Sequence, residues 1–229
     1  LLYYALLLAS SGLALAAVLH SHDDRKTPLL ISLAVIFISQ LVLLTANLLA
    51  YQRFEPIVSL FPLLHRILNL VCLFWLVWSI FRLRDASLSA WLPLISTVLI
   101  LLISALLMLS WLPVFGSQNF NFSWIDYFWI TLILLLILSA AVVYLKKYGF
   151  SSIEPLLFLS ISAAGFILYL FLPMAGNLPA VVMLSQLLYY PLLIGLVHQA
   201  PGSQPSEVGN ASDNNLKQNQ TLRSNVANT

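Results

Sequence analysis

One apolar run begins with Phe61-Pro62-Leu63-Leu64-His65-Arg66-Ile67-Leu68-Asn69-Leu70 and continues to about Phe81. Three polar residues, His65, Arg66 and Asn69, lie in its first turns. Spacings of three and four residues place them on neighbouring parts of one helical face. A cation beside a membrane-spanning segment is costly unless it reaches the headgroups, finds a partner or lines a cavity. The surroundings of Arg66 are therefore the first question that this sequence raises.

The composition is that of an integral membrane protein. Of the 229 residues, 61% are hydrophobic and 8% are charged, whereas soluble domains carry roughly 25% charged residues. The formal net charge of +2 gives no reason to expect a nucleic-acid partner. The single cysteine, Cys72, excludes an internal disulfide and a multi-cysteine metal site. We therefore expect the lipid bilayer to surround most of the chain.

Seven apolar segments are long enough to cross a bilayer as helices, because a hydrocarbon core of about 30 Å needs about 20 helical residues. The expected fold class is an all-α membrane protein, a seven-transmembrane-helix bundle. Gly149 is expected to cap the fifth helix, and Ser151 with Glu154 has the spacing of a capping box for the sixth. Pro191 should kink the seventh. The expected helices are 1–19, 28–51, 61–81 after an apolar lead-in at 57–61, 90–112, 124–145, a sixth that ends near 172, and 180–198.

Two regions differ in composition. Residues 1–199 form the expected transmembrane domain. Residues 200–229 are rich in Asn, Ser and Gln and have too little apolar area to fold alone, which predicts a disordered polar tail or linker. The chain is apolar from Leu1, without a charged region or cleavage site before the first segment, and this does not fit a signal peptide.

Basic residues predict the orientation of the bundle. With seven spans, eight of the ten lysines and arginines fall on the side that carries the loops after the first, third and fifth helices and the C-terminal tail. The other side holds only Arg53 and Arg66. Because basic loops are retained in the cytoplasm, we expect the N-terminus outside and the C-terminus in the cytoplasm.

With this orientation, most polar residues near membrane depth fall on the outer side, with aromatic residues around them. Such a convergence predicts a small-ligand site that opens outward. We expect Arg66 to pair with Asp126 of the fifth helix. The ligand-binding candidates are Arg66, Asn69, Asn121, Trp124, Asp126, Gln186 and Tyr190, and Pro191 is the candidate conformational residue.

These residues also have purely structural interpretations. Asp126 stands three residues after Ser123, which is capping-box spacing for the fifth helix. Arg66 can reach the outer headgroups, and tryptophans and tyrosines near helix ends match an interfacial belt. Asn69 and Gln186 can be interhelical hydrogen-bond partners. The sequence leaves these alternatives open.

The residue pattern argues against catalysis and cofactor binding. A retinal Schiff base needs a lysine inside the membrane, but all four lysines lie in predicted loops or in the tail. His20 and His22 supply only two zinc ligands. The sequence contains neither a GxxxxGK[ST] loop nor a GxSxG elbow. We therefore expect no metal site, no cofactor and no enzymatic activity in this chain.

Three patches share a further feature. They are Phe61-Pro62-Leu-Leu-His65-Arg66-Ile-Leu-Asn69, then Phe120-Asn121-Phe-Ser123-Trp124-Ile-Asp126, and Gly176-Asn177-Leu-Pro179 through Gln186 to Tyr190-Pro191. In this order they resemble, over residues 1 to about 198, the N-terminal seven-helix membrane module of a group of bacterial sensor histidine kinases. In that group, GAF or PAS and kinase domains follow. Two departures are His65, where an acidic residue is expected, and the lack of a phosphoacceptor helix or nucleotide-binding region after residue 200.

The resemblance implies the sensory input module of a bacterial two-component signal-transduction protein, in the cytoplasmic (inner) membrane. Such a module detects an extracytoplasmic or intramembrane cue and relays it to a cytoplasmic signalling domain or partner through the C-terminal tail. A homodimer is among the expected assemblies. Two alternatives stay open from the sequence: a small transporter or permease-like protein, and a structural subunit of a membrane complex.

Overall fold

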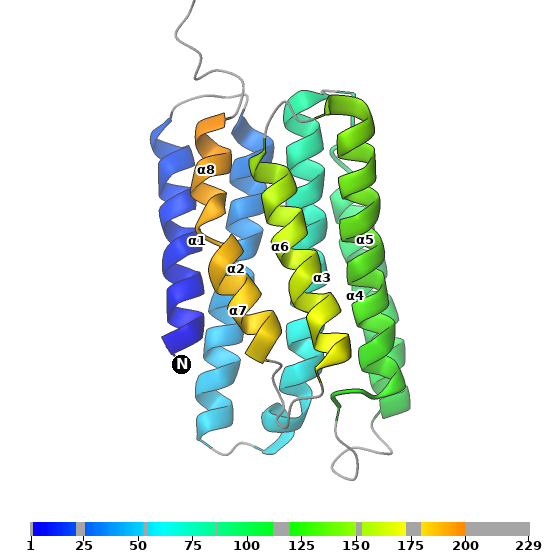
Figure 1. The fold of residues 1–229 in the computed structure, drawn as a ribbon. Helices are drawn as coiled ribbons and strands as arrows, with labels where there is room; N and C mark the ends of the chain where they lie inside the picture. The colour runs from blue at the N-terminus through cyan, green and yellow to red at the C-terminus, as the bar shows by residue number, and fades with distance from the viewer. Residues whose placement is uncertain are drawn as a thin grey trace, which may run out of the picture.

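Eight helices and the turns beside them make up the part of the chain that the structure describes. This structure is a computed structural model, and it describes residues 2–21, 26–52, 55–85, 87–111, 120–149, 153–172 and 180–199. The helices, shown in Figure 1, are α1 Leu2–His20, α2 Thr27–Tyr51, α3 Glu55–Arg84, α4 Leu92–Trp111, α5 Trp124–Tyr148, α6 Glu154–Phe171, α7 Ala180–Tyr189 and α8 Leu192–Gln199.

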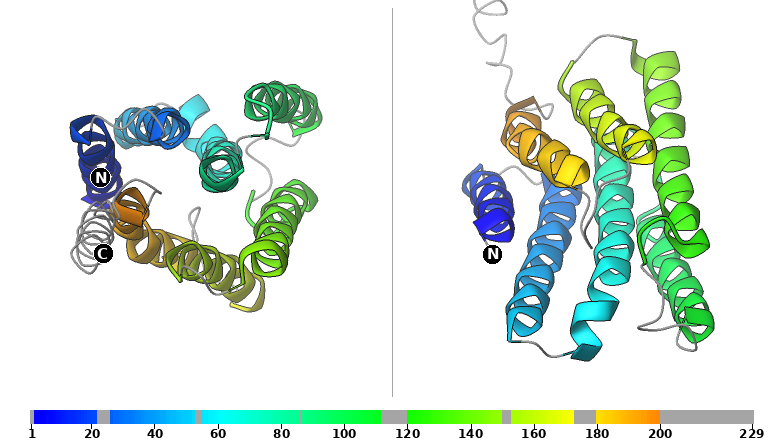
Figure 2. Two further views of the ribbon diagram at one scale, coloured as in Figure 1. Left: turned by 90° about the horizontal axis from the view of Figure 1, so that it is seen from above. Right: turned by 60° about the horizontal axis from the view of Figure 1, so that its bottom comes forward.

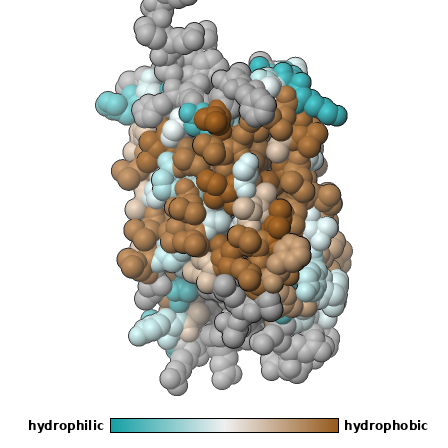
Figure 3. Space-filling view, in the orientation of Figure 1, coloured by the Kyte–Doolittle hydropathy of each residue, from teal (hydrophilic) through white to brown (hydrophobic). Residues whose placement is uncertain are grey.

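The first six helices are long and apolar enough to cross a membrane. Large apolar side chains cover their outer faces: Leu13, Ile95 and Leu135 are each at least 60% exposed. Figure 3 shows this apolar surface over the middle of the molecule, with hydrophilic residues near its two ends. A contiguous apolar surface of this kind marks contact with a membrane or another protein. Length, composition and surface together are those of a multi-pass membrane protein.

The helix boundaries correct the sequence predictions near α3 and α5. The apolar lead-in at 57–61 is the first part of α3, which begins at Glu55 and contains Pro62. Helix α5 continues three residues past its predicted end, so Lys146 and Lys147 lie in its last turn. Cations are favourable there because the C-terminus of a helix carries partial negative charge.

The predicted cap of α5 is confirmed. Gly149 has a φ of 60°, and its N–H donates to the carbonyl of Leu145 at 2.9 Å. A positive φ costs glycine little, since it has no Cβ. At the start of α6, Ile153 occupies the N-cap position without a side-chain hydrogen bond to the helix. The Ser151 of the predicted capping box lies outside the described residues, as do the predicted tail at 200–229 and Leu1.

The seventh predicted helix is broken in two. Its predicted kink at Pro191 is confirmed as an interruption between α7 and α8. Tyr190 donates its N–H to Gln186 as the last bond of α7, and Leu193 donates to Tyr190 across the break. Neither piece alone has membrane-spanning length, so the described residues contain six membrane-length helices, where the sequence predicted seven.

The helices form a closed ring with one helix outside it. Helices α1, α2, α3, α5 and α6 pack in this order, and α7 and α8 complete the ring between α6 and α1 (Figure 2). Helix α4 packs mainly against α3. In its most apolar stretch of 18 residues, α3 has 78% of its residues buried, whereas the corresponding figure for α4 is 11%. Helix α3 is thus the central element and α4 is peripheral.

Two tryptophans of α3 attach the peripheral helix. The indole N–H of Trp75 donates to the Thr97 hydroxyl of α4 at 2.9 Å. The indole N–H of Trp78 donates to the carbonyl of Ser89, just before α4, at 3.0 Å. Together these two bonds hold α4 against one side of α3.

A glycine allows α6 and α7 to approach closely. A Cβ added to Gly165 would lie 2.0 Å from the Ser185 Oγ and 2.5 Å from its Cβ. These distances are far inside van der Waals contact, so only glycine fits at this position. Small residues at a helix interface permit such close packing in membrane proteins. This close contact fixes the position of α7 at Ser185, the residue directly before Gln186.

We predict that Gly165→Ala destabilises the protein by about 1–3 kcal/mol, the usual cost of overpacking. Ser185→Gly in the same chain should recover most of this loss. Gly195→Ala is the control: its added Cβ would lie 3.8 Å from the nearest atom, the Glu154 Cγ. Unfolding in mixed micelles measures all three variants. Equal stability of Gly165→Ala and wild type would contradict the close contact.

Candidate functional site

The site is built from the start of α5. Ser123 is the N-cap, and its hydroxyl oxygen accepts from the Asp126 N–H at 3.2 Å. Phe122 before it has a φ of 63°, unusual for a residue with a side chain. This backbone directs the Phe122 N–H to the Asp126 Oδ2 at 3.0 Å. The Phe122 ring stacks on Tyr169 of α6 with ring centres 4.9 Å apart. The turn therefore fixes the Asp126 carboxylate and points it into the bundle.

Asp126 is fully buried and pairs with Arg66 of α3, as predicted. The Arg66 Nε donates to Oδ1 at 2.8 Å, and the Tyr169 hydroxyl donates to Oδ2 at 2.7 Å. The guanidinium carbon also lies 4.9 Å from the centre of the Tyr169 ring. Arg66 is 1% exposed, which contradicts the alternative that it reaches the headgroups. Asp126 is both a member of the helix start and an ion-pair partner, so the two interpretations of it hold together.

Two nitrogens of the Arg66 guanidinium take no part in the hydrogen bond to Asp126. Within the described residues, neither its Nη1 nor its Nη2 has a hydrogen-bond partner. A buried donor without a partner is costly, more so when it is charged. A group that accepts hydrogen bonds from these two nitrogens would remove that cost.

A second polar cluster lies one turn along α3 and reaches α7 and α1. The Gln186 Nε2 donates to the Asn69 Oδ1 at 2.8 Å. The Tyr3 hydroxyl of α1 donates to the Gln186 Oε1. The Asn69 Nδ2 approaches the His65 Nδ1 at 3.3 Å, and the Tyr4 ring meets the imidazole edge-on. Tyr4, His65, Asn69 and Gln186 are buried and Tyr3 is half-buried, so the cluster connects α1, α3 and α7 inside the bundle.

A third contact lies at the break of the seventh helix. The Gln40 Nε2 of α2 donates to the Tyr190 hydroxyl. Beside it is a cavity of about 10 Å³, lined in part by Asn69, Cys72 and Tyr190. That volume is about one water molecule. The predicted outward opening falls mainly on the loops at 53–54, 112–119 and 173–179, which lie outside the described residues.

The structure sorts the predicted site residues into two groups. Arg66, Asn69, Asp126, Gln186 and Tyr190 are all buried in the bundle interior. The other two are outside it: Trp124 is 60% exposed and Asn121 is half-buried in the turn before α5. Trp124 stands at the end of a helix with its ring outward, which fits the interfacial belt better than a ligand contact.

Sequence reasoning missed four participants: Tyr3, Tyr4, Gln40 and Tyr169. The tyrosines lie near helix ends, where an interfacial role is the common one. A glutamine in an apolar helix carries a clearer signal. Gln40 lies in the middle of α2, where a side-chain amide needs a partner inside the membrane.

The buried pair gives a quantitative prediction. Asp126→Asn should destabilise the protein by about 3–5 kcal/mol, since it leaves the Arg66 charge buried without its partner. Asp126→Asn combined with Arg66→Met should cost less than the two single losses added together. Asp85→Asn, which breaks a solvent-exposed pair with Lys147, is the control and should have a much smaller effect. Simple additivity in this double-mutant cycle would argue against the coupling.

Comparison with known proteins adds no relative to this description. No protein family, curated protein or solved structure matches the chain. The functional argument therefore rests on the geometry of the three polar clusters and of the broken helix.

Proposed function

We propose that this chain is the membrane-embedded sensory module of a bacterial signal-transduction protein, of the type that feeds a sensor histidine kinase. One observation carries the proposal. Buried polar contacts tie α7 to α1, α2 and α3 up to the point where the helix breaks at Pro191. The part of this helix that makes these side-chain hydrogen bonds thus lies next to the proline that interrupts it.

The cost of this arrangement supports a functional role. Polar and charged side chains inside an apolar bundle are expensive, and in membrane proteins they commonly mark functional sites. Here they connect different helices, and Asp126 does so in addition to its place at the start of α5. Their hydrogen bonds depend on direction, so they favour one arrangement of the helices over others that are packed equally well.

The broken helix is the proposed moving part. Tyr190 and Gln186 anchor the end of α7, while α8 beyond Pro191 leads to the C-terminal residues. Because proline prevents one helical hydrogen bond, the angle between the two pieces is less constrained than in a continuous helix. A cue that rearranges the polar contacts would change this angle, and α8 would pass the change to a cytoplasmic domain or partner.

The proposed stimulus acts at Arg66. A ligand group that accepts hydrogen bonds, such as a carbonyl, hydroxyl or carboxylate oxygen, would satisfy the two Nη groups that have no partner among the described residues. A ligand shifts a conformational equilibrium only as far as it binds one state better than the other. The state that presents these nitrogens to the ligand is the one it would favour.

The transporter alternative predicts solute flux into liposomes that contain the purified chain, whereas the sensory proposal predicts none. With α7 and α8 together as a seventh crossing, the proposed orientation keeps the N-terminus outside and the C-terminus in the cytoplasm, because eight basic residues then lie on one side and two on the other. The proposed location is the bacterial cytoplasmic membrane.

The test replaces the proline. A proline inside a helix costs about 3 kcal/mol, so Pro191→Ala should shift the α7–α8 joint strongly toward a continuous helix. Spin labels at Val142 of α5 and Ile194 of α8, in a Cys72→Ala background, report this as a changed distance distribution in lipid nanodiscs. We expect two distances in the parent chain and mainly one in the variant.

Pro155→Ala is the matched control. Pro155 lies in the first turn of α6, where proline is tolerated, so its replacement should leave the distances unchanged. A single distance that Pro191→Ala does not alter would show that the joint is not a two-state element. The sensory proposal would then lose its moving part.

A further inference from the structure

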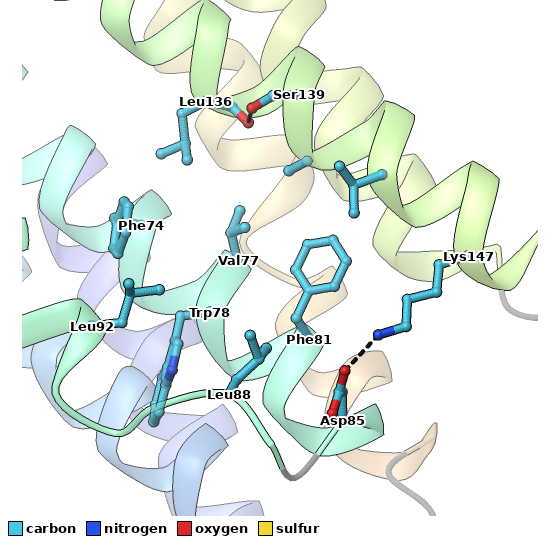
Figure 4. A pocket seen from close by; sticks show the side chains of 12 residues that line it. Phe74, Val77, Trp78, Phe81, Asp85, Leu88, Leu92, Leu136, Ser139 and Lys147 are labelled. Atoms are coloured by element: carbon cyan, nitrogen blue, oxygen red, sulfur yellow. Dashed lines mark hydrogen bonds and ion pairs between the residues drawn. The ribbon is translucent and has the colours of Figure 1, made fainter.

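A second, separate site lies at the opposite end of the bundle, between the peripheral helix α4 and the ring. It is a crevice of about 310 Å³ lined by residues of α3, α4, α5 and the α3–α4 connection. Figure 4 shows its walls: Phe74, Val77 and Phe81 of α3 on one side, and Leu136 and Ser139 of α5 on another. The Ser139 hydroxyl donates to the carbonyl of Leu136 at 3.0 Å, so this wall presents little free polarity.

The crevice exists because α4 and α5 barely touch. Helix α4 packs mainly on α3, and α5 packs on another part of α3 and on α6. The space between them faces the surroundings of the bundle. In a membrane, this surrounding medium is acyl chains, so an apolar crevice open to that side is filled by an acyl chain more readily than by water.

An ion pair between a lysine and an aspartate lies at one end of the crevice. The Lys147 Nζ and the Asp85 Oδ2 are 2.5 Å apart, and both side chains are part-exposed. Hydrogen bonds from Lys147 and Ser87 hold the pKa of the Asp85 carboxyl well below its usual range, so Asp85 is ionised at neutral pH. Exposed ion pairs are weak, and Lys147 can therefore exchange Asp85 for another anion at little cost.

The surroundings of this rim are strongly basic. Lys146 lies next to Lys147, and the Arg84 guanidinium stacks over the Tyr144 and Tyr148 rings at 5.1 and 4.9 Å. Basic pockets between membrane helices at the cytoplasmic side attract anionic lipid headgroups. The apolar crevice thus matches the acyl chain of an anionic phospholipid, and the cationic rim at its end matches the phosphate.

We propose that the crevice between α4 and α5 binds an anionic phospholipid, with an acyl chain along Phe81 and Ser139 and its phosphate at Lys147. The phosphate displaces the Asp85 carboxylate from Lys147. This site is independent of the polar interior around Arg66, and its failure would leave the sensory proposal untouched.

The test compares lipids that differ only in the headgroup. Native mass spectrometry of the full chain, with phosphatidylglycerol and phosphatidylcholine of identical acyl chains, measures which lipid is retained. One lysine at an anionic surface corresponds to about a fivefold preference, so we expect about fivefold more retained phosphatidylglycerol.

Three single substitutions are expected to change the preference for phosphatidylglycerol in different ways. Lys147→Gln should remove the preference. Asp85→Asn should increase it, because the competing carboxylate is gone. Lys146→Gln is the matched control: Lys146 is an equally charged neighbour that does not line the crevice, and its replacement should leave most of the preference in place. Equal losses from Lys146→Gln and Lys147→Gln would mean a diffuse surface attraction and would overturn the site.

A measurement on the unmodified protein covers the case in which a variant fails to fold. Phosphatidylglycerol with a photoreactive diazirine in its acyl chain should cross-link to residues 74–81 and 136–143, and unlabelled phosphatidylglycerol should suppress this better than phosphatidylcholine. Cross-links spread evenly over the exposed faces of α1, α2 and α4 would show general lipid contact and would overturn the proposal.

Discussion

The buried ion pair between Arg66 and Asp126 is the constraint on which the interior depends. Charges are costly at membrane depth unless they are paired and hydrogen-bonded. Asp126 meets this condition with three donors: the Arg66 Nε, the Tyr169 hydroxyl and the Phe122 N–H. These donors come from α3, α6 and the turn before α5, so satisfying one carboxylate fixes three parts of the chain relative to one another.

The polar clusters each determine the orientation of different helices in the bundle. Apolar packing holds membrane helices together but discriminates weakly between rotations of a helix that is apolar on every side. The cluster of Asn69, Gln186 and Tyr3 sets the rotation of α7 and α1 against α3, and Gln40 with Tyr190 sets that of α2. Helix α4 has few such contacts, and it is the helix that stands outside the ring.

Much of the fold could be predicted from the sequence, because apolar length and glycine or proline punctuation are local properties. The first six helices, the Gly149 cap and the break at Pro191 follow from them. The pairing of Arg66 with Asp126 could be predicted from opposite charges expected at the same end of the bundle. The predicted start of α3 was wrong because Pro56 and Pro62 suggested a break in the helix, whereas α3 contains both prolines. The role of Tyr169 was missed, since only the packing of α6 against α5 shows that its hydroxyl points inward.

The peripheral position of α4 has a consequence for biogenesis. A chain that enters the membrane from its N-terminus delivers α4 before α5, yet α5 is the helix that occupies a place in the ring beside α3. The α3–α4 hairpin must therefore leave that place vacant until α5 arrives. The tryptophan bonds from α3 to Thr97 and Ser89 hold α4 to one side of α3. They therefore keep α4, which is inserted first, out of the position in the ring that α5 later occupies.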